Sequence, residues 1–371
     1  MPLITISVIK ADVGSIGGHT QPSMDMVFAC QESLKNKGFF DYMVTYTGDD
    51  ICFIISHRFG TGNTIVHKAC WDAFVKATDV AHRQGLYGAG QDLLVDAPSG
   101  NIRGAGPAVA EIEFECDFNN KDRPAEAFLV FAADKCGPGA YNLPLYLTFC
   151  DPMHNGGLLL SPKLHLGFTL TIIDMDNKDG DKIIKLNSPE DAWDIAALLR
   201  DTDRFAIEAV HSRYKPNEQI VSVSATRLHN IAGKYTGKDD PVALVRTQGM
   251  FPAPEEVVEP YYLGHYVTGD CRGSHVMPLM PMPIMTPVAG PYCLPIVSAL
   301  AFSMNGDGIL SHVDLFGNLV WDATRHKIMQ KAEEFRRQGF FGVTMASHQE
   351  LAYTGIVDTL KELDKKFVVR K

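Results

Sequence analysis

The sequence predicts an α+β fold in a single large domain, residues 1–371, with helices covering large antiparallel sheets. Expected strands and helices follow one another in mixed order, without the regular alternation that builds a parallel sheet. Several apolar segments are separated only by short polar turns, which is typical of hairpins. Neither an internal repeat nor a linker divides the chain, and the segment from about residue 277 to 371 contributes irregular loops and closing helices.

The N-terminal part begins with a buried strand, LITISVIKAD, at residues 3–12. Helical periodicity then predicts one helix over residues 22–37 and a longer amphipathic helix over residues 63–84. Between these helices, two strands flank the turn TGDD at residues 47–50.

The rest of the chain combines strands, a hairpin and helices. Residues 166–186 predict a hairpin with a polar turn. A serine cap and an acidic first turn predict a helix over residues 188–200. Six prolines make residues 277–295 extended and irregular. Further strands are expected near residues 109–116, 127–133, 143–149, 205–214 and 219–225, and further helices near 322–338 and 356–366.

The composition argues against several kinds of partner. A formal net charge of −10 disfavours binding to nucleic acid or to an anionic membrane. Eight cysteines show no C-x-x-C spacing, so we expect buried thiols in a reducing compartment. The N-terminus lacks a signal-peptide pattern, and the apolar runs are far shorter than a membrane span. We therefore expect a cytoplasmic protein with no nucleic-acid partner and no membrane partner.

Acidic side chains recur where predicted strands end or where glycine-rich turns follow them. These positions are Asp12, with His19 in the next loop, Asp49, Asp50, Asp134, Asp239 and Asp240. Taken singly, each also fits a helix cap, a hairpin turn or a strand-end salt bridge. Gathered together, such carboxylates would repel one another unless divalent cations neutralised them. Mg²⁺ prefers oxygen ligands and shares its coordination with phosphates, so the pattern favours a multi-metal site for phosphoryl chemistry.

Several motifs resemble, in the same order and over roughly residues 3–360, the fructose-1,6-bisphosphate aldolase/phosphatase family of archaea and deep-branching bacteria. They are ISVIKADVGSIGGH, TGDD, GLYGAGQDLL, SGNIRGAGP, ADK-x-x-PGAYNLPLY, IAGKYTGKDDP and RGSH-x-x-PLMP. The resemblance implies a four-layer α-β-β-α sandwich, a homo-octamer and a gluconeogenic enzyme that depends on several Mg²⁺ ions per subunit.

The resemblance also implies roles for individual residues. Lys238 corresponds to the Schiff-base lysine and Tyr235 to the proton donor and acceptor. The implied metal ligands are Asp12, His19, Asp49, Asp50, Gln91, Asp134, Asp239 and Asp240. The implied sugar-phosphate contacts are His19, Tyr87, Gly100, Asn101, Lys135, Thr247, Gln248, Arg272 and Tyr353. One departure is Ala289, which stands where the family usually has an aspartate in the substrate site.

The implied activity has two steps. Dihydroxyacetone phosphate and glyceraldehyde 3-phosphate condense through a Schiff base to fructose 1,6-bisphosphate, and the C1 phosphate is then hydrolysed to give fructose 6-phosphate. Two alternatives stay open, namely a phosphatase-only homologue with weak aldolase activity and a non-catalytic sensor of sugar phosphates and metal. The presence of Lys238, Tyr235 and all the aspartates argues against the sensor.

The segment GKYTGKDDP raises a chemical question, because Lys238 directly precedes two carboxylates. Neighbouring carboxylates hold a lysine protonated, and a protonated amine is no nucleophile, so a surface charge cluster is the alternative interpretation. If Asp239 and Asp240 bind Mg²⁺, the cation lowers the pKa of Lys238 and frees its amine. We expect Gly237 to let this loop move between an aldolase position and a phosphatase position.

Overall fold

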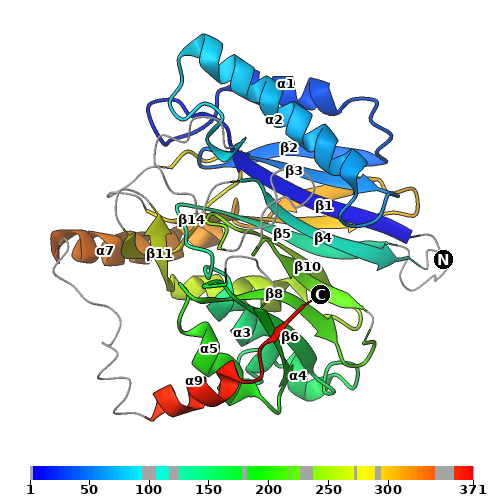
Figure 1. The fold of residues 1–371 in the computed structure, drawn as a ribbon, viewed down its shortest axis with the longest axis vertical. Helices are drawn as coiled ribbons and strands as arrows, with labels where there is room; N and C mark the ends of the chain where they lie inside the picture. The colour runs from blue at the N-terminus through cyan, green and yellow to red at the C-terminus, as the bar shows by residue number, and fades with distance from the viewer. Residues whose placement is uncertain are drawn as a thin grey trace.

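The computed structural model describes residues 3–93, 106–116, 125–177, 182–216, 218–225, 237–270, 274–288, 294–338 and 355–370, and the structural statements below refer to these residues. Two sheets face one another, and helices lie on the outer face of each (Figure 1). Strand pairs are antiparallel apart from the short pair of β13 (Met280–Pro281) with β14 (Ile296–Met304). The chain is therefore of mixed helix and strand, compatible with the predicted α+β class.

The smaller sheet has the N-terminal strand in its interior. Its order is β2 (Asp41–Thr47), β3 (Asp50–His57), β1 (Leu3–Asp12) and β4 (Ala108–Glu115). Helices α1 (Met24–Leu34) and α2 (Thr64–Gln84) cover its outer face (Figure 1). The side chains of Ser23 and Asn63 cap these helices by accepting backbone N–H groups of the first turn. The first strand, the TGDD hairpin and both helices predicted here are confirmed.

The larger sheet has ten strands. Its order is β13, β14, β5 (Glu126–Asp134), β10 (Val242–Thr247), β9 (Gln219–Val223), β8 (Phe205–Ser212), β6 (Phe168–Asp174), β7 (Lys182–Ser188) and β16 (Val368–Val369), with β15 (Leu310–Asp314) also paired to β14. The predicted hairpin is the pair β6–β7. A separate hairpin joins β11 (Tyr266–Asp270) and β12 (Ser274–Pro278). Buried side chains of the smaller sheet, such as Val8, and of the larger sheet, such as Phe128 and Leu244, form the core between the two sheets.

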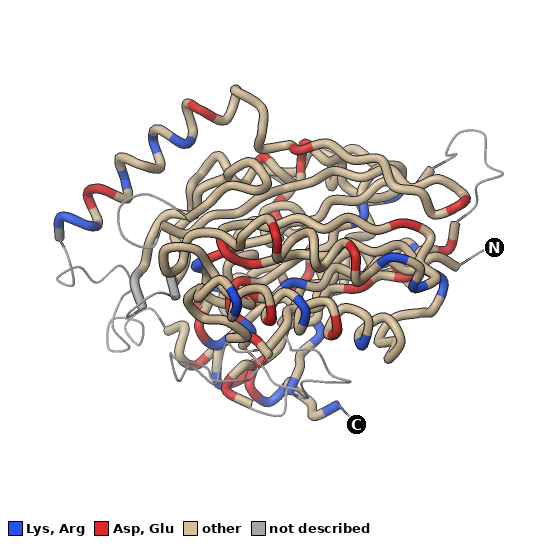
Figure 2. The backbone as a smooth tube through the Cα atoms, turned by 90° about the horizontal axis from the view of Figure 1, so that it is seen from above, with Lys and Arg blue, Asp and Glu red and all other residues tan. Residues whose placement is uncertain are grey.

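Helices on the other face of the larger sheet contribute to a second core. They are α3 (Asn142–Cys150), α4 (Gly157–Leu160), α5 (Ala192–Leu199), α6 (Pro254–Val258) and α9 (Ile356–Asp364). The 3-10 turns η2 (Glu259–Leu263) and η3 (Leu319–Trp321) also contribute to this core, whereas η1 (Gln91–Leu93) contributes Leu93 to the core beneath α1 and α2. Helix α7 (Asp322–Gln338) projects from the body and carries both signs of charge along its length (Figure 2). The predicted closing helices are confirmed by α7 and α9.

One predicted element is wrong and another is wrong in part. Residues 143–149 form a helix rather than a strand, because Leu145 and Phe149, four positions apart, are buried on one helical face. The apolar run was too short for its period to separate helix from strand. Ser188 does not cap a helix but ends strand β7, where its hydroxyl donates to the carbonyl of Phe149 at 2.8 Å. The following helix begins only at Ala192.

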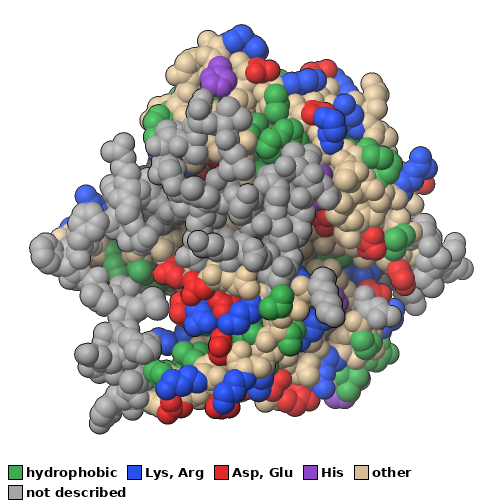
Figure 3. Space-filling view, in the orientation of Figure 1, with side chains coloured by type: hydrophobic (Ala, Val, Ile, Leu, Met, Phe, Trp, Pro, Cys, Tyr) green, Lys and Arg blue, Asp and Glu red, His purple; other side chains and the backbone are tan. Residues whose placement is uncertain are grey.

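The burial of the cysteines and the mixture of charges on the surface are as expected from the composition. Six cysteines lie in the described part of the chain, and all six are buried and free, which confirms the expected thiol burial for them. Basic and acidic side chains are interspersed on the face drawn in Figure 3. Among the described helices, none has the length and apolar content needed to cross a membrane.

A buried ion cluster ties strand β10 to its neighbours. The Arg246 guanidinium donates to Glu126 through Nε at 3.2 Å and Nη2 at 3.1 Å, and through Nη1 to Glu218. It also lies between the rings of Phe114 and Phe251, 4.7 and 4.8 Å from their centroids. The side chain of Arg246 is only 3% exposed and compensates the charge of both carboxylates, while Glu218 also has Lys215 Nζ at 3.6 Å.

Replacing Arg246 with Ala should lower the free energy of unfolding by about 3–5 kcal/mol, because two largely buried carboxylates lose the guanidinium that joins them. The matched control is Lys68→Ala, which removes an exposed ion pair with Asp72 and should cost less than about 1 kcal/mol. Urea denaturation of both variants measures the difference. A loss below 1 kcal/mol for Arg246→Ala would contradict the structural role given to this cluster.

Candidate active site

The candidate site forms where strand ends from both sheets meet. Asp12 ends β1 and is paired in register with Asp50, the first residue of β3. Asp134 ends β5, and Asp240 precedes β10 by two residues. Because β5 and β10 are antiparallel neighbours, the end of one lies beside the start of the other. The fold therefore brings together four acidic residues that are far apart in the sequence.

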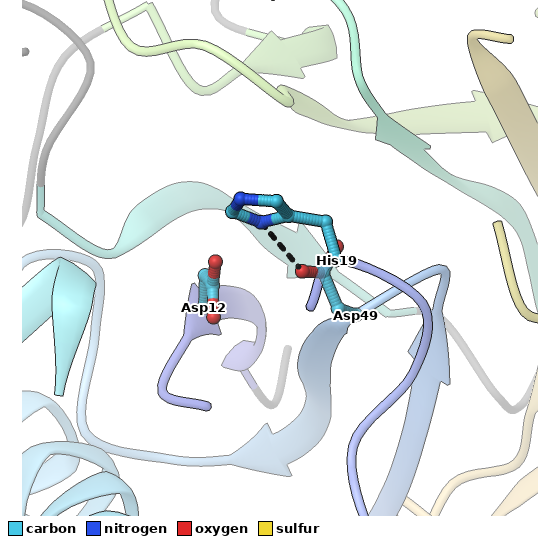
Figure 4. Close-up of side chains that lie close together, drawn as sticks. All are labelled: Asp12, His19 and Asp49. Carbon is cyan, nitrogen blue, oxygen red and sulfur yellow. Dashed lines mark ion pairs between the residues drawn. The ribbon is translucent and has the colours of Figure 1, made fainter. Parts of the chain in front are cut away.

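A first group of possible metal ligands consists of Asp12, His19 and Asp49. One ligand atom from each lies within 4.8 Å of the others. Figure 4 shows the three side chains, with His19 Nδ1 3.4 Å from the Asp49 carboxylate. The imidazole of His19 also packs edge-on against Tyr87, with ring centroids 4.8 Å apart. The structure thus places the predicted substrate residue Tyr87 beside a predicted metal ligand.

A second group consists of Asp50, Asp134 and Asp240, which also offer ligand atoms within 4.8 Å of one another. Asp240 has a positive φ of 47°, and its backbone N–H donates to the carbonyl of Cys136 while its carboxylate accepts the Cys136 N–H, both at 2.7 Å. These two bonds hold a non-glycine residue in an uncommon conformation, as is frequent at functional sites. Gly48 leaves room for Asp134, because a Cβ there would lie 1.5 Å from its carboxylate.

The two groups adjoin one another. The backbone N–H of Asp49 donates to Asp134 at 3.0 Å, and Lys135 donates to Asp49 and lies 3.0 Å from Asp134. Asp49 and Asp50 point to different groups, as expected for consecutive residues at the start of a strand. The TGDD turn therefore serves both groups from one hairpin.

Three buried lysines compensate part of the negative charge. Lys10 donates to Asp50, Lys135 contacts Asp49 and Asp134, and Lys238 donates to Asp239 Oδ1 at 2.7 Å. Lys238 is 2% exposed, so it is not part of a surface charge cluster. Burial alone would lower the pKa of Lys238, but Asp239 and Asp92 outweigh it and hold the pKa above the usual range.

The pKa values of three carboxylates in the site are raised as well. Burial, reinforced by neighbouring carboxylates, raises the pKa of Asp12 and of Asp240 well above the usual range. The pKa of Asp134 is also raised well above the usual range, mainly by burial. Burial would also raise the pKa of Asp49, but Lys135 and His19 hold it below its usual value. The cluster therefore favours the uptake of positive charge, either as protons or as a cation.

The donor atoms fit a hard divalent cation. Asp49 Oδ2, Asp134 Oδ1 and Gln91 Oε1 are buried and accept no well-aligned hydrogen bond from the described residues, although His19 Nδ1 lies 3.4 Å from Asp49 Oδ2 and Lys135 Nζ lies 3.0 Å from Asp134 Oδ1. Carboxylate and amide oxygens in this arrangement suit Mg²⁺, which keeps several waters of its own. Buried oxygens with incomplete hydrogen bonding are costly in a folded protein, so a further ligand for them is expected.

Not every predicted site residue lies at this site. Thr247 and Gln248 are at the far end of β10, where Thr247 is paired with Ala127, whereas Val242 near the site is paired with Ala132. Five further strand residues at about 3.3 Å each separate that end from the carboxylates, so the structure does not bring these two residues to the others. Five predicted site residues fall outside the described part of the chain, namely Gly100, Asn101, Tyr235, Arg272 and Tyr353. Ala289 also falls outside it.

Sequence reasoning missed two residues of the site. Lys10 is the only basic residue in a strand that is buried from its second residue on, which was a usable signal for a functional or paired residue. Asp92 follows the predicted ligand Gln91 and is buried, 3.4 Å from Lys238 Nζ. Burial raises the pKa of Asp92 to about 6, against the effect of Lys238.

Known proteins with similar sequences share nearly the whole chain. The sequence family described as Fructose-1,6-bisphosphatase matches residues 3–368. The fructose-1,6-bisphosphate aldolase/phosphatase of Thermus thermophilus is 52% identical over 98% of this chain and 99% of its own. The proteins of the same name from Cenarchaeum symbiosum and Methanothermobacter marburgensis are 44% and 42% identical, covering 99% and 98% of this chain and 96% and 98% of their own. With this coverage and the buried carboxylate and lysine site at the strand ends, the chain belongs to the fructose-1,6-bisphosphatase family that includes these bifunctional aldolase/phosphatases.

Proposed function

We propose that the protein condenses dihydroxyacetone phosphate with glyceraldehyde 3-phosphate to fructose 1,6-bisphosphate and then hydrolyses the C1 phosphate to give fructose 6-phosphate. The names of its relatives support both activities. The observation that carries the proposal is one buried lysine, Lys238, held between carboxylates beside two groups of possible metal ligands. A phosphatase alone has no need of such an amine, whereas a Schiff-base aldolase requires one.

In the condensation, Lys238 is the nucleophile. Its amine attacks the C2 carbonyl of dihydroxyacetone phosphate, and loss of water leaves an iminium that accepts electrons when a C3 proton departs. The amine must first lose a proton, which the carboxylates around it oppose. A cation held by Asp239 and Asp240 would weaken that opposition and leave Asp92 as the carboxylate that still faces the amine. We assign Tyr235, three residues earlier, to proton transfer in these steps.

In the hydrolysis, the carboxylates take the main role. Asp12, His19 and Asp49 would hold one cation, and Asp50, Asp134 and Asp240 a second, with Gln91 and Asp239 as further ligands. Bound Mg²⁺ would activate a water molecule and stabilise the leaving oxygen of the C1 phosphate. Lys135, buried between Asp49 and Asp134, offers a cation to phosphate oxygens, as does Arg272 by resemblance.

Several broader properties remain our proposals. The order of helices, sheets and helices in Figure 1 supports a four-layer α-β-β-α sandwich in a single domain for the complete chain. A homo-octamer, a cytoplasmic location and a place in gluconeogenesis follow from the resemblance. The sugar-phosphate roles of Tyr87, Gly100, Asn101 and Tyr353 are proposed on the same ground, whereas no role at this cluster is proposed for Thr247 and Gln248, which lie at the far end of β10.

Replacing Lys238 with Ala should abolish condensation and leave most of the phosphate release, because only the first step needs the amine. Both activities are measured on one preparation, together with borohydride trapping of a dihydroxyacetone phosphate adduct. Lys361→Ala, which changes a lysine 68% exposed on α9, is the matched control and should change neither activity. Equal loss of both activities in Lys238→Ala, or no adduct on Lys238 in the unaltered protein, would contradict the assigned role.

Adding Mg²⁺ should raise the melting temperature by several degrees, because ligand binding to the folded state at about 100 times Kd contributes roughly 2.7 kcal/mol. Asp134→Asn should lose most of this shift, since it removes a buried ligand that contacts both groups. The control is Asp358→Asn on α9, at a side chain 85% exposed. Calorimetry with and without Mg²⁺ measures the shift, and an equal shift in all three proteins would show that these carboxylates bind no cation.

A further inference from the structure

Asp92 is a buried carboxylate of the site that belongs to neither group of possible metal ligands. It lies in the 3-10 turn η1 and is 4% exposed. Its side chain is nevertheless within reach of the proposed nucleophile, because Lys238 Nζ donates to its Oδ2 at 3.4 Å. Burying a charge costs free energy unless the charge is paired and hydrogen-bonded, so the contacts of Asp92 bear on its role.

The position of Asp92 is fixed by the backbone of two other segments. The N–H of Asp12, at the end of β1, donates to Oδ2 at 2.9 Å. The N–H of Gly106, ahead of β4, donates to Oδ1 at 3.2 Å. Both carboxylate oxygens are therefore anchored, and the carboxylate is held in place independently of Lys238.

The other carboxylate on Lys238 is of a different kind. Asp239 accepts from Lys238 Nζ at 2.7 Å, but it is the next residue in the chain and its side chain is 19% exposed. Under the proposed function, the Asp239 carboxylate would bind a cation, which would then neutralise part of its charge. Asp92, held by two backbone amides, stays in reach of Lys238 through this change.

We propose that Asp92 is the positioning residue of Lys238, which holds Nζ in the orientation for attack on the carbonyl and faces the positive charge of the iminium. This inference rests on the proposed function. The proton that the ammonium gives up before attack is used again when the carbinolamine hydroxyl leaves as water, so overall lysine ammonium plus ketone gives iminium plus water, and the nitrogen is positively charged at the start and at the end. A fixed anion at this distance therefore pairs with both states without itself gaining or losing a proton.

The test is Asp92→Asn, which keeps the shape and one acceptor oxygen but removes the charge. Condensation and the rate of borohydride trapping at Lys238 should both fall by roughly 100-fold, the scale expected when a reacting group is misplaced. Phosphate release from fructose 1,6-bisphosphate should stay within about threefold, because hydrolysis does not use the amine. Retained phosphate release also shows that the variant is folded.

Asp92→Glu restores the charge and should recover at least part of the trapping rate relative to Asp92→Asn. Asp79→Asn, an exposed position on α2, is the matched control and should behave as the unaltered protein. Unchanged condensation in Asp92→Asn, or an equal fall of condensation and phosphate release, would overturn the inference. An unaltered protein without a Lys238 adduct would instead overturn the proposed function, so the two failures are distinguishable.

Discussion

The structure depends on burying more negative than positive charge at one end of two facing sheets. Asp12, Asp49, Asp50, Asp92 and Asp134 are buried there and Asp240 is partly buried, whereas the buried cations beside them are Lys10, Lys135 and Lys238. Buried charges are tolerated only when they are paired, and the lysines cannot pair all of these carboxylates. Raised pKa values at Asp12, Asp134 and Asp240 express the same imbalance. Divalent cations are the simplest way to relieve it, so the electrostatics of the fold and the phosphoryl chemistry have a common origin.

The same imbalance decides what Lys238 can do. Without a cation, Asp239 and Asp92 hold its pKa above the usual range, and it is an ion-pair partner rather than a nucleophile. We predict that the pKa of Lys238 is lowered only when a metal ion is bound. If cations withdraw charge from Asp239 and Asp240, one loop connects the two activities, because the residues that would serve hydrolysis also control the amine that would serve condensation. Asp92 is anchored by two backbone amides, so under our proposal it remains a partner of Lys238 whether or not Asp239 binds a cation.

The sequence predicted the strong periodic elements well and the short ones poorly. The strand before Asp12 and the helix after Asn63 have long, clear apolar patterns and are confirmed, whereas residues 143–149 have too short an apolar run to reveal a helix. Convergence of Asp12, Asp50, Asp134 and Asp240 was predicted from strand ends, but the register that produces it is set by tertiary pairing. Lys10 and Asp92 were missed because their importance lies in three-dimensional neighbours rather than in local pattern. The position of Gln248 at the opposite end of β10 was equally invisible from the motif order.

The most direct measurement of the central claim is the anomalous scattering of Mn²⁺, used in place of Mg²⁺, in crystals of the protein. The account predicts one peak among Asp12, His19 and Asp49 and a second among Asp50, Asp134 and Asp240, each within coordination distance of oxygen or nitrogen ligands. Crystals grown at saturating Mn²⁺ with no peak at either group, and with these carboxylates neutralised only by Lys10, Lys135 and Lys238, would contradict it.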